Sequence, residues 1–175
     1  DELSLWSAPF GLKLLDSITM RRGMKVLDFG CGLGFPMLEL AERLGMTSEV
    51  YGLDPSPEAL AVIQQKITDW QIGNAKIIRG IAEAIPFPDC FFDFIVANNG
   101  INNVSDQAKA LKECYRVSKP GAHIILTVNL PETMTEFYRI FEQTLYEAGY
   151  SDEISKMHHH IAEKRKSAVQ LSQLI

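Results

Sequence analysis

A cluster of glycines follows a short apolar run near the amino terminus. The run Val26–Phe29 contains one acid, Asp28, and leads into Gly30, Gly32 and Gly34. Glycine lets a backbone turn tightly and approach a ligand closely, and a helix that starts directly after the turn presents free N–H groups to an anionic group. This spacing predicts a strand, a turn and a helix that bind a ligand. Many such turns use glycine only to reverse direction, so the prediction depends on further residues.

An acid stands twenty positions after the last of these glycines. Asp54 directly follows a second apolar run, Val50–Leu53. At that place in a nucleotide-binding unit, a carboxylate can accept hydrogen bonds from both hydroxyls of a ribose. The alternative is a capping role in the turn with Pro55, but Ser56 is available as the cap of the helix that follows. We therefore predict that Asp54 binds ribose.

The spacing of the glycines separates two classes of cofactor. The dinucleotide fingerprint G-x-G-x-x-G would place its third glycine at position 35, where this chain has Phe35. The order here, from Asp28 to Gly34, is D-x-G-x-G-x-G, which resembles motif I of class I methyltransferases. Two alternatives stay open beside methyl transfer: a nicotinamide-dependent oxidoreductase and a non-catalytic module that binds S-adenosylmethionine.

Three later segments resemble the same family, in the same order along the chain: Val50–Ser56, Gly80–Pro88 and Leu111–Gly121. The subgroup they resemble most is the type 11 set, which includes methyltransferases of ubiquinone and menaquinone biosynthesis. The resemblance implies an α/β fold, a three-layer Rossmann-like sandwich with a mostly parallel sheet in the order 3-2-1-4-5. It also implies that the cofactor is S-adenosylmethionine, that the product is S-adenosylhomocysteine, and that the methyl acceptor is a small molecule.

The resemblance assigns roles to individual residues. The glycine loop would hold the methionine moiety, Asp28 would orient its ammonium group, and Asp54 would hold the ribose. The family's usual aspartate beside the adenine amine is Ile81 here, so apolar contact and backbone groups around Ala82 would hold the ring. No residue is assigned a catalytic role, because the sulfonium already activates the methyl group and positioning is the protein's main task. The predicted cofactor-binding residues are Asp28, Gly30, Cys31, Gly32, Gly34, Asp54, Pro55, Ile81, Ala82 and Asn98.

Four asparagines follow the fourth apolar run, where the resembling family places cofactor and substrate contacts. The segment Asn98–Asn103 lacks the N-P-P-Y motif of amino-methylating enzymes that act on nucleic acids, which favours another class of substrate. Asn99, Asn102 and Asn103 are the candidate substrate contacts. For Asn99 and Asn102 a turn role is equally open, because asparagine tolerates unusual backbone angles.

These residues need a scaffold, and the rest of the chain predicts one. Short apolar runs alternate with helical patterns, which is typical of a parallel sheet with helices on both faces. A cap at Ser105 is expected to open the helix before the fifth strand. The expected strands are 25–29, 50–53, 76–78, 94–97 and 123–128, and the expected helices are about 9–19, 36–44, 57–69, 105–118, 132–148 and 159–174.

Composition limits the remaining function classes. A chain of 175 residues that is 46% hydrophobic and 22% charged predicts one globular domain over residues 1–175. The net charge of -5 argues against a nucleic-acid partner. Three cysteines without metal or redox spacing predict reduced thiols, no metal site and a cytoplasmic location, and no stretch is long and apolar enough to span a membrane.

Adjacent residues on a helix point about 100° apart, so His158–His160 should not converge on one ion.

The carboxyl terminus carries a further expectation. The helical pattern ends at 171–175, about where the resembling family enters strand six of a seven-stranded sheet. We therefore expect strands six and seven to be absent from these residues and the domain to be incomplete at its carboxyl end. The fifth strand would then be an exposed edge through which a homo-oligomer could form.

Overall fold

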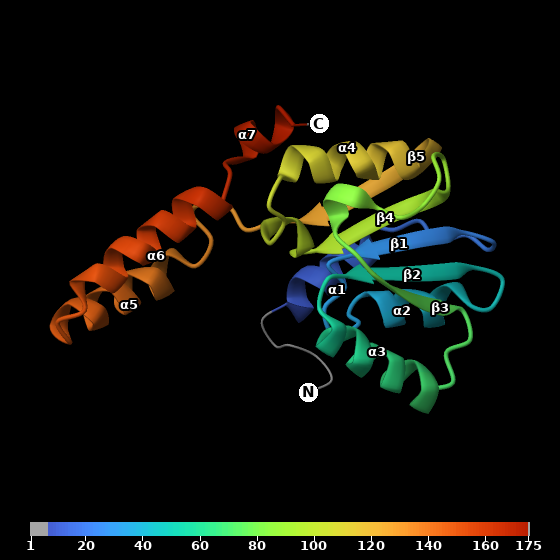
Figure 1. Cartoon of the computed structure of the whole chain (residues 1–175), viewed down its shortest axis with the longest axis horizontal. Coiled ribbons are helices and arrows are strands. Elements are labelled where there is room, and N and C mark those ends of the chain that lie inside the picture. Colours follow the sequence, from blue (N-terminus) through green and yellow to red (C-terminus); the bar gives the residue numbers. More distant parts are fainter. Residues whose placement is uncertain (1–6, 175) are drawn as a thin grey trace. The chain divides into compact units, whose positions relative to one another are not determined.

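A computed structural model describes residues 7–174 (Figure 1). The chain forms two compact units, one that ends at Val128 and one that begins at Asn129. The first unit contains the whole sheet and is the one that carries the predicted site. The single methyltransferase domain expected over residues 1–175 stays a prediction.

The first unit is built on one sheet of five parallel strands. Neighbouring strands pair in the order β3-β2-β1-β4-β5, which confirms the predicted order. Within residues 7–174, β5 pairs with β4 and with no further strand, so it is an edge of this sheet. Association through that edge stays a prediction. The strands are β1 Lys25–Phe29, β2 Glu49–Asp54, β3 Ala75–Arg79, β4 Phe92–Asn98 and β5 Ser118–Thr127.

Helices cover both faces of this sheet and enclose two apolar cores (Figure 1). Successive side chains of a strand point to opposite faces, so Val26 lies in one core while Leu27 and Phe29 lie in the other. The first core also contains side chains of α1 (Ala8–Asp16), α2 (Met37–Leu44) and α3 (Pro57–Asp69), and the second contains those of α4 (Gln107–Val117). The three-layer sandwich expected from the sequence is confirmed.

Two boundaries around α4 differ from the prediction. The cap of this helix is Asp106, whose Oδ1 accepts a hydrogen bond from the Lys109 N–H at 3.0 Å, so the expected cap at Ser105 is wrong. Strand β5 begins at Ser118, well before the expected residue 123. Its pairing with β4 shifts register between Phe92 and Phe94, which pair with Ser118 and His123, so the irregularity in β5 contains the Pro120-Gly121 pair.

The second unit consists of three helices: α5 Thr135–Glu147, α6 Ser151–Lys164 and α7 Ala168–Ser172. The expected helix over 159–174 is wrong, because Ser167 and Gln170 form a capping box that starts a new helix at Ala168. His158 lies inside α6, with Nε2 3.2 Å from Glu142 Oε2. Within the part of the chain that the structure describes, no cluster of histidine, cysteine and acids is arranged to hold a metal ion.

A membrane-crossing helix would need length and apolar character together. None of the helices between residues 7 and 174 has both.

Candidate functional site

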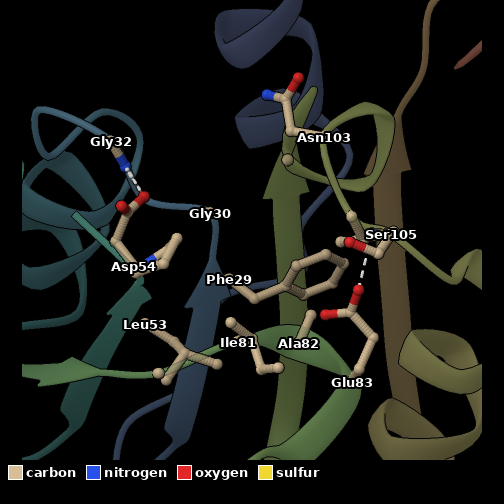
Figure 2. Close-up of a pocket in the computed structure, with 14 residues that line it drawn as sticks. Phe29, Gly30, Gly32, Leu53, Asp54, Ile81, Ala82, Glu83, Asn103 and Ser105 are labelled. Carbon is tan, nitrogen blue, oxygen red and sulfur yellow. Dashed lines mark hydrogen bonds between the residues drawn. The ribbon is translucent and has the colours of Figure 1, made fainter.

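A cavity opens at the carboxyl ends of the central strands (Figure 2). Its volume is about 400 Å³, within the range of pockets that bind small molecules. In open parallel sheets, ligands bind outside the carboxyl ends of the strands where the strand order reverses, and here that point lies between β1 and β4. The lining residues are Phe29, Gly30, Gly32, Leu53, Asp54, Pro55, Gly80, Ile81, Ala82, Glu83, Gly100, Asn103, Val104 and Ser105.

The glycine loop contributes two residues to the cavity wall, and each is glycine for a different reason. Gly30 has φ +67°, and a Cβ there would lie 2.8 Å from the Cα of Gly100, so only glycine lets the loops after β1 and β4 approach this closely. Gly32 has φ +53°, and a Cβ there would meet no protein atom within 4 Å. Space for a ligand is therefore left beside Gly32.

Asp54 ties this loop to the end of β2. Its Oδ2 accepts a hydrogen bond from the Gly32 N–H and its Oδ1 accepts one from the Ser56 N–H, each at 2.9 Å. A carboxylate offers about four acceptor directions, so both oxygens can accept further bonds. Ser56 Oγ caps α3 by accepting from the Ala59 N–H at 3.1 Å, so Asp54 is not needed for that role. In Figure 2 its carboxylate stands at the cavity wall beside Gly32.

The opposite wall is closed by Glu83, in the short 3-10 helix Ala82–Ala84. Its Oε1 accepts hydrogen bonds from the N–H groups of Ser105 and Asp106, at 2.7 and 3.2 Å. Only 8% of the residue is exposed. The carboxylate therefore joins the turn after β3 to the loop that leads into α4, and Figure 2 shows the bond to Ser105 across the cavity rim.

An ion pair on α4 binds the backbone of the residues that directly follow this turn. The Arg116 guanidinium donates to the carbonyl oxygens of Ile85 and Phe87 at 2.9 and 2.8 Å, and Glu113 accepts from the Ile85 N–H at 2.9 Å. Arg116 and Glu113 also bond each other, which lowers the pKa of the Glu113 carboxyl. The segment that carries Ile81 and Glu83 is thus fastened to a helix along its length.

Asp28 is buried completely, and neither of its carboxylate oxygens has a hydrogen-bond partner in the described residues. Burial raises the pKa of this carboxyl well above its usual range, and the nearby Asp54 carboxylate raises it further. Burying an unpaired charge is costly, so this carboxylate suits a cationic partner. It does not line the cavity itself.

Replacing Asp28 with asparagine should stabilise the protein, because the variant buries no charge. The folded-state pKa of Asp28 lies above its unfolded-state value of about 3.9, so the wild type loses stability as pH rises above that value. The gain in unfolding free energy should be small near pH 4 and grow as pH rises toward neutral. Urea unfolding of both proteins between pH 4 and 8 measures it. A difference in unfolding free energy between the two proteins that does not grow with pH would contradict this explanation.

Seven of the residues predicted from the sequence meet in this cavity, and six do not line it. Cys31 packs below the loop, and burial raises the pKa of its thiol, which leaves it unreactive. Gly34 faces α2 and α3, since a Cβ there would lie 2.8 Å from Leu38 and 3.4 Å from Ile63. The seven that line the cavity are Gly30, Gly32, Asp54, Pro55, Ile81, Ala82 and Asn103; the six that do not are Asp28, Cys31, Gly34, Asn98, Asn99 and Asn102.

The asparagines after β4 have different places: Asn98 and Asn99 form hydrogen bonds within the protein, and Asn103 lines the cavity. Asn98 donates to the Ser7 carbonyl at 3.1 Å and accepts from Thr127 Oγ1 at 2.8 Å, which links α1, β4 and β5. Asn99 has φ +61°, a conformation in which asparagine is enriched, and its N–H donates to Thr127 Oγ1. This geometry favours the turn role for Asn99, whereas Asn103 lines the cavity. Contact of Asn99, Asn102 and Asn103 with substrate stays a prediction.

Seven lining residues were missed from the sequence. Phe29 is the last residue of β1 and Leu53 the last but one of β2, beside the motif residues, so the alternation along each strand offered a signal for them. Glu83 lies in the segment that resembles the adenine region, but its carboxylate had been given no role. Gly80 lies in that same segment and had likewise been given no role. Gly100, Val104 and Ser105 carried no signal for the cavity, because only the folding of loops onto one another brings them there.

Comparison with known proteins places this geometry in a family. Residues 27–126 match the family model of the type 11 methyltransferase domain. A demethylmenaquinone methyltransferase of Geobacillus sp. (strain WCH70) is 40% identical over 124 residues, which are 71% of this chain and 53% of that protein. A demethylmenaquinone methyltransferase of Geobacillus kaustophilus (strain HTA426) is 37% identical over 124 residues, again 71% of this chain and 53% of that protein. The chain thus spans about half the length of the curated relatives it matches.

Solved structures agree with the sequence comparison. A SAM-dependent methyltransferase from Aquifex aeolicus superposes with a TM-score of 0.65 and 27% identity, over 79% of this chain and 78% of that one. The shared fold has its ligand crevice where the cavity lies here. The family match runs from within β1 to within β5, and all of the residues that line the cavity lie in it. The chain belongs to the type 11 methyltransferase domain family, within the class I Rossmann-like methyltransferases.

Proposed function

We propose that this protein binds S-adenosylmethionine in the cavity and transfers its methyl group to a small-molecule acceptor. The observation that carries the proposal is Asp54, whose carboxylate lies at the cavity wall with both oxygens able to accept further hydrogen bonds, beside the open face of Gly32. Adjacent ribose hydroxyls are donors that match such a carboxylate.

The residues present fit this cofactor in charge as well as in shape. S-adenosylmethionine carries an ammonium and a sulfonium, and Asp28 and Asp54 are buried carboxylates on adjacent strands. The side chains of Phe29, Leu53 and Ile81 line the cavity and offer apolar surface against which a purine ring can pack. In this proposal Asp54 holds the ribose, Asp28 orients the ammonium group, and Ile81 and Ala82 cover the adenine.

The bound cofactor supplies an activated methyl group, and the protein's part is to orient it and exclude water. The loop Gly30–Gly34 fixes the cofactor through its backbone. Asn103, which lines the cavity, is the described side chain best placed to orient an acceptor. Because relatives are named demethylmenaquinone methyltransferases, we propose an aromatic acceptor of the quinol type.

Calorimetric titration with S-adenosylmethionine, S-adenosylhomocysteine and NAD tests the cofactor directly. Binding of the first two and not of NAD supports the proposal, whereas binding of NAD alone would favour the oxidoreductase alternative. Turnover against a panel of quinols, phenols and thiols then separates an enzyme from a module that only binds the cofactor. Binding without transfer to any acceptor would contradict methyl transfer.

Ile81→Asp should tighten binding of the cofactor. Ile81 lines the cavity and is 49% exposed, so an aspartate there can reach the ligand without being buried unpaired. A carboxylate beside the adenine amine would add a charge-assisted hydrogen bond, which corresponds to about a threefold to tenfold gain in affinity when partly exposed to solvent. Calorimetry with S-adenosylhomocysteine measures it, with Ile81→Asn as the uncharged control. A loss of affinity in both variants would show that this segment does not lie beside the amine.

A further inference from the structure

Only one of the two carboxylate oxygens of Glu83 accepts hydrogen bonds from the described residues. Its Oε1 is occupied by the N–H groups of Ser105 and Asp106, while Oε2 has no hydrogen bond or ion pair in the described residues. Figure 2 shows this second oxygen turned into the cavity, toward Phe29 and Ala82. Glu83 is therefore an acceptor held in a fixed position and aimed at whatever fills the cavity.

The side chains around Oε2 of Glu83 restrict which kind of ligand group can pair with it. The side chains that line this part of the cavity are mainly apolar: Phe29, Ile81, Ala82 and Val104. Within residues 7–174, no lysine or arginine forms an ion pair with Glu83. An acceptor in such surroundings is costly to leave unpaired, so the ligand that fits best presents an N–H group there. Asp54 meets its donors at the other wall, beside Gly32.

We propose that Glu83 selects the base of the cofactor by accepting a hydrogen bond from the exocyclic amine of adenine. The inference rests on the proposed function, because it takes the ligand to be an S-adenosyl compound whose ribose lies at Asp54. Ile81 offers no polar atom for the amine, and Glu83 is the buried carboxylate on the same turn. A purine with a carbonyl oxygen in place of the amine would face the carboxylate with a second acceptor and be rejected.

The substitution Glu83→Gln reverses this recognition and leaves the loop anchored. Its amide has one oxygen and one NH2 group, and only the oxygen can accept from the Ser105 and Asp106 N–H groups. The NH2 group must therefore face the cavity, where it disfavours the adenine amine and favours a carbonyl oxygen. The probes are S-adenosylhomocysteine and S-inosylhomocysteine. At position 6 of the base the first has an amine and the second a carbonyl oxygen, with a proton added on the neighbouring N1.

In calorimetric titrations we expect the wild type to bind S-adenosylhomocysteine at least tenfold more tightly than S-inosylhomocysteine. In Glu83→Gln that ratio should fall at least tenfold, through a loss for the first ligand and a gain for the second. Glu113→Gln is the matched control, because it removes a carboxylate that holds the same turn but lies outside the cavity. It should weaken both ligands equally.

The outcomes separate this inference from the proposed function. If the wild type binds neither homocysteine compound, the proposed function fails. If the wild type binds S-adenosylhomocysteine and Glu83→Gln leaves the ratio unchanged, the role of Glu83 is overturned and the proposed function stands. Should the variant not fold, as judged by circular dichroism, the wild-type ratio decides, and equal affinity for the two ligands overturns the inference.

Discussion

Asp54→Ala should weaken S-adenosylmethionine binding by about a hundredfold or more. The substitution removes two charge-assisted hydrogen bonds to ribose, each contributing about 1.5 to 3 kcal/mol. It also releases the Gly32 N–H, which Asp54 holds at 2.9 Å, so the glycine loop loses its anchor to β2. Calorimetry on the variant, with thermal unfolding to show that it is folded, measures the effect.

Asp54→Asn is the control that separates the two contributions. Asparagine keeps one acceptor oxygen with two acceptor directions, in place of the four of the carboxylate, and carries no charge, so its affinity should fall between those of the wild type and the alanine variant. A folded Asp54→Ala protein with unchanged affinity would remove this carboxylate from the ligand site, and with it the observation on which the proposed function depends.

Gly32→Val should abolish detectable cofactor binding. The missing Cβ at this position leaves open space in the cavity wall, and a branched side chain would occupy the volume that the ligand needs. Valine is also strained at φ +53°, because β-branched residues avoid the left-handed region. The expected result in calorimetry is no measurable heat at ligand concentrations that saturate the wild type.

Gly121→Val distinguishes a blocked cavity from a strained backbone. Gly121 has φ +80° and no protein atom within 4 Å of its missing Cβ, as at Gly32, but it lies in β5 and does not line the cavity. Both variants should unfold at a lower temperature than the wild type, and only Gly32→Val should lose ligand binding. Normal binding by Gly32→Val would place the cofactor elsewhere.

The glycine motif and Asp54 illustrate how much of the site is local information. Strand, turn and helix follow one another within about ten residues, and the second acid stands at the end of the next strand, so spacing alone predicted a nucleotide-type crevice. The structure confirms the strand order and has a cavity at that place, whereas nucleotide binding there stays a prediction. Local pattern was weaker at helix boundaries. Ser105 and Asp106 compete for one cap, and within 159–174 a capping box starts a new helix at Ala168.

Glu83 and Asp28 show what spacing along the chain does not reveal. Both are acids near a motif, yet one lines the cavity across from Asp54 and the other is buried beneath the loop without a partner. The difference arises from which face of its element each side chain occupies and what packs against it. The resemblance had given Asp28 a role and Glu83 none.

The sequence by itself determined the fold class, the family and the carboxylate at the end of β2, because these depend on residue types at short, fixed separations. Only the tertiary structure decided which residues share the cavity, since its wall combines the loops after β1, β2, β3 and β4. The orientation of Glu83 follows from two backbone N–H groups more than twenty residues away. Contacts across such separations depend on how the sheet and α4 pack, which no local pattern encodes.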